Sequence, residues 1–417
     1  MTCALLYIDP GTGSMLFSLL MALATTAVFV SRELFIRLKF VLSGGKASKA
    51  GSSKIPIVIY SDHKRYWNVF KPVCDEAERR GVNITYYTQS SDDPVLSTPY
   101  EHIKAEFIGE GNKGFAKLNF LKADVVLSTT PGLDVYQWKR SRNVKWYVHI
   151  PHLAGDLTTY RMFGLDFYDT VLLTGNYQGQ DVRTLERLRG IKEKELVIVG
   201  CTFFDSMRAR LASSPRPHNE KTCVLVAPSW GKSGILSVYG KRLLDPLAAS
   251  GLDVVIRPHP QSLTAEKDLL CSLEAAYKDC SNVSWNYDND NFDILNKADV
   301  MITDFSGVIF DYTLVFGKPV IYSKIEAFDS SPYDACWLNH ELWTFSVLPE
   351  MGVELDAEDF NDIKKIIEDA VSNENFRQNR ERISGEAWQN KGGAAKAVVD
   401  YLTKKTSRHE DKVGISE

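Results

Sequence analysis

The sequence predicts an α/β protein built from two similar domains, each with a mainly parallel sheet and helices on both faces. Short apolar runs alternate with longer segments of helical periodicity through most of the chain. This alternation stops once, in a Pro- and Ser-containing stretch at 212–220, and then restarts. Short strands separated by helices are typical of parallel sheets. We therefore predict a domain at 55–211, a linker at 212–220 and a second domain at 221–385, with a cleft between the domains.

The predicted strands are the short apolar runs themselves. In the first domain they are 55–60, 82–87, 123–127, 145–148, 170–173 and 195–199, and in the second 223–227, 253–256, 282–285, 300–302 and 319–322. Predicted helices lie between them at 66–80, 179–189, 239–249, 264–279, 292–297 and 308–316. Helices at 358–371 and 394–403 end the fold, the second in a closing segment at 386–404, and a polar tail follows at 405–417. Ligands of such sheets bind at the carboxyl ends of the strands.

An apolar segment precedes the two domains. Residues 15–30 carry no charge, and at ~1.5 Å per residue they reach about 24 Å, slightly less than a ~30 Å hydrocarbon core. Basic residues follow this run and none precedes it, which places the main body in the cytoplasm and disfavours a cleaved signal peptide. We expect 1–42 to be a membrane-spanning or anchoring segment and 43–54 a flexible tether. An interfacial helix and a re-entrant hairpin at Pro10 are the competing interpretations.

The composition argues against several classes of function. A net charge of -4 gives no electrostatic footprint for nucleic acid. The seven cysteines include no Cys-x-x-Cys pair, which indicates reduced thiols in a cytosolic compartment. The loop 227–234 lacks the full P-loop spacing, and 288–291 lacks the glycine and glutamate of an EF-hand. No Asp-x-Asp follows a strand at the predicted cleft, so we predict neither a metal nor a cofactor.

The stretch 298–312 reads as a strand, a tight turn and a helix. Ser306 is placed to cap the helix, and the N–H groups beyond it, Gly307 included, form with the helix dipole a seat for a phosphate. Asp304 and Asp311 flank this seat. The alternative is that the serine and the aspartates serve capping alone.

Two histidines follow strands at the predicted cleft edge. The turn Arg257-Pro-His259-Pro is stiffened by its prolines, and its guanidinium and imidazole are suited to clamp a diphosphate. Alternatively, His259 only hydrogen-bonds a loop carbonyl. His152 lies in a loop after the strand 145–148, where a neutral imidazole is suited to act as a general base. Ser229, in the loop after the strand 223–227, is placed to contact a phosphate or nucleotide.

Together, His152, Arg-Pro-His-Pro at 257–260 and Thr-Asp-Phe-Ser-Gly-Val-Ile-Phe-Asp at 303–311 resemble the CDP-glycerol glycerophosphotransferase family, which builds teichoic acids and related polymers. The resemblance covers roughly residues 120–400. This chain has His152-Leu where the family commonly has His-Gly or His-Ser, and Ser306-Gly where it usually has Ser-Ser. Residues 7–14 look like a membrane-proximal motif of surface-polymer pathways.

The resemblance implies a GT-B fold and a chemistry for each motif. His152 is implied as the base that deprotonates an acceptor hydroxyl, which attacks the β-phosphorus of CDP-glycerol or CDP-ribitol and releases CMP. The diphosphate is then held by Arg257, catalytic His259, Ser306 with Gly307, and Ser229, while Asp304 and Asp311 orient these groups or a polyol hydroxyl. Implied partners are the CDP-alcohol, a polymer or lipid-linked acceptor, and a bacterial cell membrane with the catalytic domains on its cytoplasmic face.

Two alternatives stay open at this point. A GT-B glycosyltransferase that uses a nucleotide sugar in capsule or exopolysaccharide synthesis would need the same fold and phosphate seat. A membrane-tethered nucleotide-binding scaffold without catalysis would bind the ligand and form no product. Donor profiling separates all three.

Overall fold

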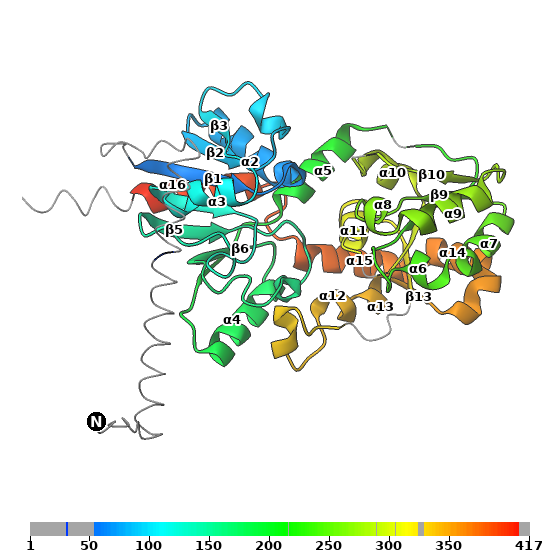
Figure 1. Cartoon of the computed structure of the whole chain (residues 1–417). Helices are drawn as coiled ribbons and strands as arrows, with labels where there is room; N and C mark the ends of the chain where they lie inside the picture. Colours follow the sequence, from blue (N-terminus) through cyan, green and yellow to red (C-terminus); the bar gives the residue numbers. More distant parts are fainter. Residues whose placement is uncertain are drawn as a thin grey trace, which may run out of the picture.

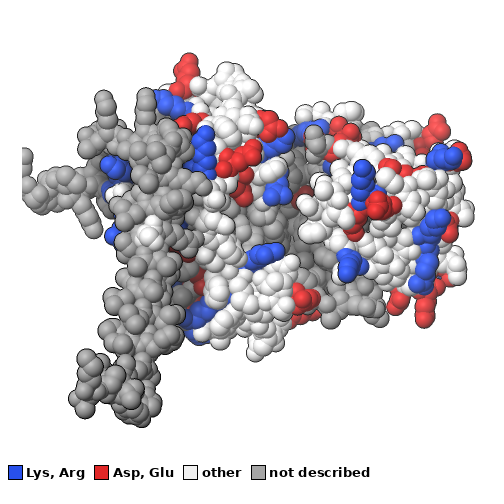
Figure 2. All heavy atoms as spheres, viewed as in Figure 1, with Lys and Arg blue, Asp and Glu red and all other residues white. Residues whose placement is uncertain are grey.

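The protein, in a computed structural model, forms two lobes that lie side by side (Figure 1). The structure describes Ser31 and residues 54–215, 217–288, 290–304, 306–323 and 329–407. We call the lobe around the first sheet the front lobe and the lobe around the second sheet the rear lobe. On the visible face, basic and acidic side chains are interspersed without a broad area of one sign (Figure 2). The two parallel α/β sheets expected from the sequence are confirmed.

The front lobe contains a seven-stranded parallel sheet in the order β3-β2-β1-β4-β5-β6-β7. Its strands are β1 (Ile55–Ser61), β2 (Ile84–Thr88), β3 (Ile103–Phe107), β4 (Ala123–Ser128), β5 (Val144–His149), β6 (Thr170–Leu173) and β7 (Glu195–Ile198). Its helices are η1 (Lys64–Tyr66), α2 (Trp67–Arg79), η2 (Pro94–Leu96), α3 (Asn112–Asn119), η3 (Leu157–Thr159), α4 (Tyr177–Arg189) and α5 (Thr202–Ser213). The central strands are apolar and buried on both faces, as parallel strands covered by helices require.

The rear lobe repeats the plan with a six-stranded parallel sheet in the order β10-β9-β8-β11-β12-β13. Its strands are β8 (Cys223–Ala227), β9 (Asp253–Ile256), β10 (Val283–Trp285), β11 (Val300–Thr303), β12 (Val320–Ser323) and β13 (Gly352–Leu355). Its helices before β12 are α6 (Ile235–Tyr239), α7 (Lys241–Ala249), α8 (Ser262–Ala265), α9 (Lys267–Tyr277), α10 (Phe292–Lys297), α11 (Val308–Phe310) and the π-helical η4 (Asp311–Val315). Those after it are η5 (Asp334–Trp337), α12 (Trp343–Ser346), α13 (Leu348–Met351), η6 (Ala357–Asp362), α14 (Ile363–Ser372) and α15 (Glu374–Ala387).

The chain returns to the front lobe at its end. Helix α16 (Ala394–Ser407) packs Val398 and Leu402 into the core formed by β1 and α2. The hydroxyl of Tyr401 lies 2.6 Å from that of Thr170 on β6. The front-lobe core is therefore completed by a helix that follows the entire rear lobe in sequence (Figure 1).

A segment of the rear lobe, residues 329–347, reaches across to the front lobe, and we call it the interlobe strap. Asp334 in the strap forms an ion pair of 2.6 Å with Arg189 of α4, and both side chains are almost fully buried. The N–H groups of Phe163 and Gly164 also donate to the Asp334 carboxylate. The two lobes are thus joined by polar contacts as well as by the chain crossings.

Several elements differ from the sequence-based expectation. Two strands, β3 and β13, were not predicted, and both are sheet edges with half-exposed, partly charged sequences. The helices that were not predicted are α3, α5, α6, α12, α13 and α15. The helix expected at 308–316 is instead a short α-helix followed by a π-helical segment. The predicted membrane segment 1–42 lies outside the described residues except for Ser31. Within the ranges that are described, no helix is both long and apolar enough to cross a bilayer.

Candidate functional site

The front-lobe histidine, His152, lies in the loop that follows β5. Its Nδ1 is 3.1 Å from the hydroxyl of Thr129, which follows the neighbouring strand β4. A hydroxyl can donate or accept, so this contact is compatible with either tautomer of the neutral ring. In the tautomer with the proton on Nδ1, Nε2 keeps a free lone pair.

The surroundings of His152 keep it neutral. Burial, and then the nearby guanidinium of Arg65, lower the pKa of His152 to about 4. Its ring is 4.8 Å from that of Tyr66 and 5.8 Å from that of Tyr160. His149, the last residue of β5, is fully buried, and its Nε2 lies 3.2 Å from the Tyr160 hydroxyl. His149 therefore supports the aromatic packing behind His152.

The rear-lobe histidine, His259, has the opposite arrangement of its ring nitrogens. The N–H of Gln261 donates to its Nδ1 at 3.1 Å, so the proton of the neutral ring is on Nε2. Burial, and then Arg65 of the front lobe, lower the pKa of His259. A neutral imidazole with a proton on Nε2 is a hydrogen-bond donor, which suits an anionic ligand.

Arg257 is held by its own lobe. Its guanidinium donates to the side chain of Asn286 and, at 2.7 Å, to the carbonyl of Asp288. Burial lowers its pKa, while the nearby carboxylates of Asp288 and Asp290 act in the opposite sense. The predicted clamp of Arg257 on a diphosphate therefore stays a prediction, and in this structure the residue braces the loop after β10.

Asp304, at the end of β11, organises the loop after β8. Its carboxylate is 1% exposed and accepts the backbone N–H groups of Ser229, Ile235 and Ser306 at 2.8–3.1 Å. Burial raises the pKa of this carboxyl, and the three N–H groups act in the opposite sense. Asp304 is thus a positioning residue for the loop that carries Ser229, rather than a group directed at a ligand.

The predicted cap of the helix after β11 is not formed. Helix α11 has Gly307 at its N-cap position, and in the described structure no side chain caps it, so the expectation for Ser306 was wrong. Gly307 is exposed, and a Cβ atom there would meet nothing within 4 Å. Asp311 lies further along, where burial raises its pKa to about 7 and a hydrogen bond from Asn291 opposes this shift. It neighbours Cys201 at the junction of the lobes.

The loop that carries His152 packs directly on the helix after the Thr303–Gly307 turn. Ala154 belongs to the same buried cluster as Phe310, and a Cβ on Gly155 would lie 4.0 Å from the Phe310 ring. The carboxylate of Asp156 accepts the N–H groups of Trp343 at 3.2 Å and Thr344 at 2.7 Å, which begin α12 of the rear lobe. The two predicted motifs are therefore adjacent across the junction between the lobes.

Arg65 is the site residue that the sequence reasoning missed. It is exposed in η1, directly after β1, and its guanidinium lies 5.1 Å from the centre of the Tyr66 ring. It lowers the pKa of both His152 and His259, although these histidines belong to different lobes. The sequence did contain a signal for Arg65, because Lys64-Arg65 follows a strand at the same sheet edge as His152. Thr129 and Asp156 were also missed, because each is a single polar residue in a loop.

No metal-ligand group emerges from this arrangement. Across the described ranges, no three His, Cys, Asp or Glu side chains are grouped so that they could hold a metal ion. The polar groups at the junction are instead two imidazoles, one guanidinium and backbone amides. These groups bind anions and move protons.

Two solved structures, each with a uridine nucleotide or nucleotide sugar bound, are similar to this chain. UDP-GlcNAc 2-epimerase from Neisseria meningitidis, bound to UDP-GlcNAc, matches with a TM-score of 0.55 and 12% identity over 84% of this chain and 100% of that chain. MnaA from S. aureus, solved with UDP, matches with a TM-score of 0.55 and 13% identity over 85% of this chain and 97% of that chain. At such low identity these likenesses show the fold alone, a GT-B-like pair of α/β domains. A comparison with curated proteins finds no match.

A family model gives the functional assignment. The model described as CDP-Glycerol:Poly(glycerophosphate) glycerophosphotransferase matches residues 180–398, which is more than half of the 417 residues. The match contains Arg257, His259 and the 303–311 motif, while His152 lies before it. The chain therefore belongs to the CDP-glycerol:poly(glycerophosphate) glycerophosphotransferase family, and it is a transferase.

Proposed function

We propose that the protein transfers glycerol phosphate or ribitol phosphate from a CDP-alcohol to a hydroxyl of a cell-surface polymer or lipid-linked acceptor. The acceptor oxygen attacks the β-phosphorus, a new phosphoester bond forms, and the bond to the bridging oxygen breaks to release CMP. The acceptor proton passes to Nε2 of His152. Such transfers depend mainly on positioning and on stabilisation of negative charge.

The observation that carries the proposal is that one arginine acts on a histidine from each lobe. We assign to His152 the tautomer with a lone pair on Nε2, which suits a base, while the proton on Nε2 of His259 suits a donor to the diphosphate. The positive charge of Arg65 lowers the pKa of both imidazole rings. Binding of the anionic donor offsets this charge, so the pKa of His152 rises toward the working pH when the substrate is present.

A glycosyltransferase that uses a nucleotide sugar is the second candidate. It is favoured by the fold likeness to an epimerase bound to UDP-GlcNAc and needs the same anion-binding groups. The family match favours the CDP-alcohol, because the rear-lobe motifs lie inside the matched residues. A scaffold without catalysis would not require a base opposite the donor site.

The test is a donor panel with detergent-solubilised full-length protein. We expect CMP release with CDP-glycerol or CDP-ribitol in the presence of an acceptor, and none with UDP-sugars. Turnover with nucleotide sugars only would replace the proposal by the second candidate, and binding without product would favour the scaffold.

We also infer that residues 1–42 hold the enzyme at a bacterial cell membrane with both lobes on the cytoplasmic face. The support is the uncharged run 15–30 and the basic residues that follow it. Flotation of the full-length chain with lipid vesicles is the direct check, and protein that stays in the dense fraction would contradict the inference.

A further inference from the structure

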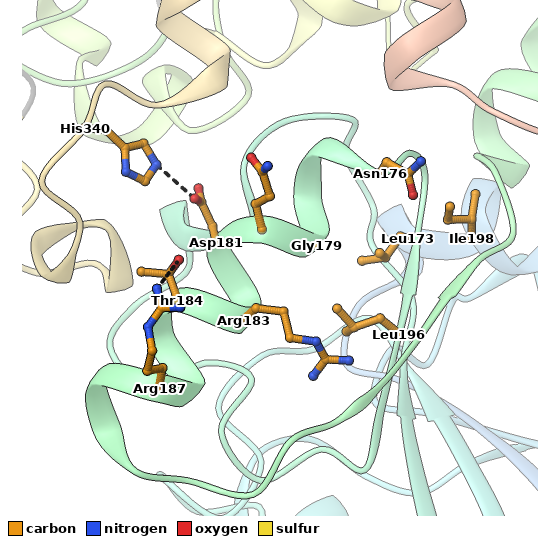
Figure 3. Close-up of a pocket in the computed structure, with 11 residues that line it drawn as sticks. Leu173, Asn176, Gly179, Asp181, Arg183, Thr184, Arg187, Leu196, Ile198 and His340 are labelled. Carbon is orange, nitrogen blue, oxygen red and sulfur yellow. Dashed lines mark hydrogen bonds and ion pairs between the residues drawn. The ribbon is translucent and has the colours of Figure 1, made fainter.

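An open cavity of about 540 Å³ lies on the front lobe (Figure 3). Its lining comes from β6, β7, one side of α4 from Gly179 to Arg187, the preceding Asn176, and His340 of the interlobe strap. Neither His152 nor His259 lines it. The volume is in the range of cavities that hold small ligands. This cavity is not used by the transfer chemistry described above.

The cavity has an aliphatic side and a polar side. Leu173, Leu196 and Ile198 form the first, where β6 and β7 end (Figure 3). The polar side is formed by amide, hydroxyl and charged groups, which are Asn176, Gln180, Asp181, Arg183, Thr184, Arg187 and His340. No phenylalanine, tyrosine or tryptophan lines it, so it offers no platform on which a nucleobase could stack.

The charges on the wall leave one guanidinium without a carboxylate. Asp181 is paired with His340 at 2.9 Å, and Arg183 is held by Glu186 and by the carbonyl of Lys194. Arg187 is exposed and donates only a long hydrogen bond of 3.5 Å to the Thr184 hydroxyl. In the part of the chain that the structure describes, no carboxylate forms an ion pair with Arg187. This guanidinium is therefore available for an anion.

The cavity adjoins the loop that carries His152. Gln178, in the first turn of α4, donates from Nε2 to the carbonyl of Gly155 at 2.9 Å. Gly179, the next residue, lines the cavity. The first turn of α4 thus contacts both the cavity and the loop that holds the candidate base.

We propose that this cavity holds a polyol-phosphate segment of the acceptor, behind the terminal hydroxyl that reacts at His152. The proposal rests on the proposed function. Arg187 binds a phosphate, the amides and the Thr184 hydroxyl bind polyol hydroxyls, and the leucine side covers the carbon chain. The site therefore favours acceptors that already carry several repeats over a single polyol phosphate.

The experiment measures binding of a soluble glycerol phosphate oligomer to the full-length protein by calorimetry, without any donor. Arg187→Glu is expected to weaken binding by about tenfold or more, as expected for a lost charge-assisted contact. Gly179→Leu is a second variant that fills the cavity without a change of charge, and we expect a similar loss. Arg142→Glu is the control, because this substitution changes the net charge by the same amount. Arg142 is exposed just before β5, at the amino ends of the strands and away from the cavity.

The outcomes separate the cavity from the reaction. If the wild-type protein releases CMP from a CDP-alcohol but the oligomer binds both cavity variants as tightly as wild type, or does not bind at all, the cavity proposal is wrong and the proposed function stands. If no CDP-alcohol is turned over but both cavity variants, and not Arg142→Glu, weaken oligomer binding, the proposed function fails and the cavity stands. If Arg142→Glu weakens oligomer binding as much as Arg187→Glu does, the oligomer binds through the overall charge of the protein and not in the cavity. This result would overturn the proposal.

Discussion

The histidines of the two lobes have the same side chain and opposite hydrogen-bonding roles. In the front lobe, Nδ1 of His152 faces the Thr129 hydroxyl, and the tautomer that we propose there keeps a lone pair on Nε2. In the rear lobe, His259 accepts the N–H of Gln261 on Nδ1, so its Nε2 carries a proton. The comparison teaches that the groups beside Nδ1, rather than the residue type, set the hydrogen-bonding role that each Nε2 can take.

The strongest way to break the comparison is His152→Ala. Because a general base contributes roughly 10²- to 10⁴-fold, we expect CMP release to fall by at least 10²-fold. The measurement is steady-state CMP release, with circular dichroism to verify the fold. A variant that works at nearly the wild-type rate would remove His152 from the mechanism.

Glutamine at each position sharpens the comparison. The amide of His259→Gln can still donate a hydrogen bond, so it should recover part of the ~10²-fold loss expected for His259→Ala. His152→Gln cannot accept a proton and should be as slow as His152→Ala. Rescue at both positions, or at neither, would contradict the two assigned roles.

Arg65→Ala tests the charge that both histidines share. Loss of a charge-assisted contact should raise KM for the CDP-alcohol by about tenfold. Arg65 lowers the pKa of His152 and His259, so its removal should raise both and shift the acid limb of the kcat/KM profile to higher pH. Arg142→Ala is the matched control. An unchanged acid limb would place Arg65 outside the site.

The smallest expected effect concerns the junction that brings the histidines together. Asp156→Ala removes a buried carboxylate that accepts two N–H groups at the start of α12. We expect a loss of ~1–3 kcal/mol in the free energy of unfolding, measured by urea denaturation. No loss of stability would mean that the interlobe contact through Asp156 is not needed to hold the lobes together.

The sequence predicted the central parts of the fold because central strands are continuous apolar runs. Strands β4 and β11 match their expected runs closely. The edge strand β3, Ile-Lys-Ala-Glu-Phe, carries charges and is half exposed, so its pattern resembles a surface loop. The front-lobe core also depends on α16, and no local pattern indicates that this helix packs on the front lobe after the whole rear lobe has been formed by the preceding residues.

The candidate site was predictable where polar residues follow strands, as for His152 and His259. The roles of Asp304 and Arg257 were not, because they depend on which backbone groups lie beside them after folding. Arg65 was missed because a single arginine after a strand is common on protein surfaces. Only its proximity to both imidazoles distinguishes it.

The most direct test of the account is a structure of the inactive His152→Ala variant with CDP-glycerol bound. We expect an oxygen of the diphosphate within about 3 Å of Nε2 of His259, with Arg65 beside it and the β-phosphorus facing the position vacated by the His152 ring. A diphosphate bound away from His259 and Arg65, or a β-phosphorus that faces away from position 152, would contradict it.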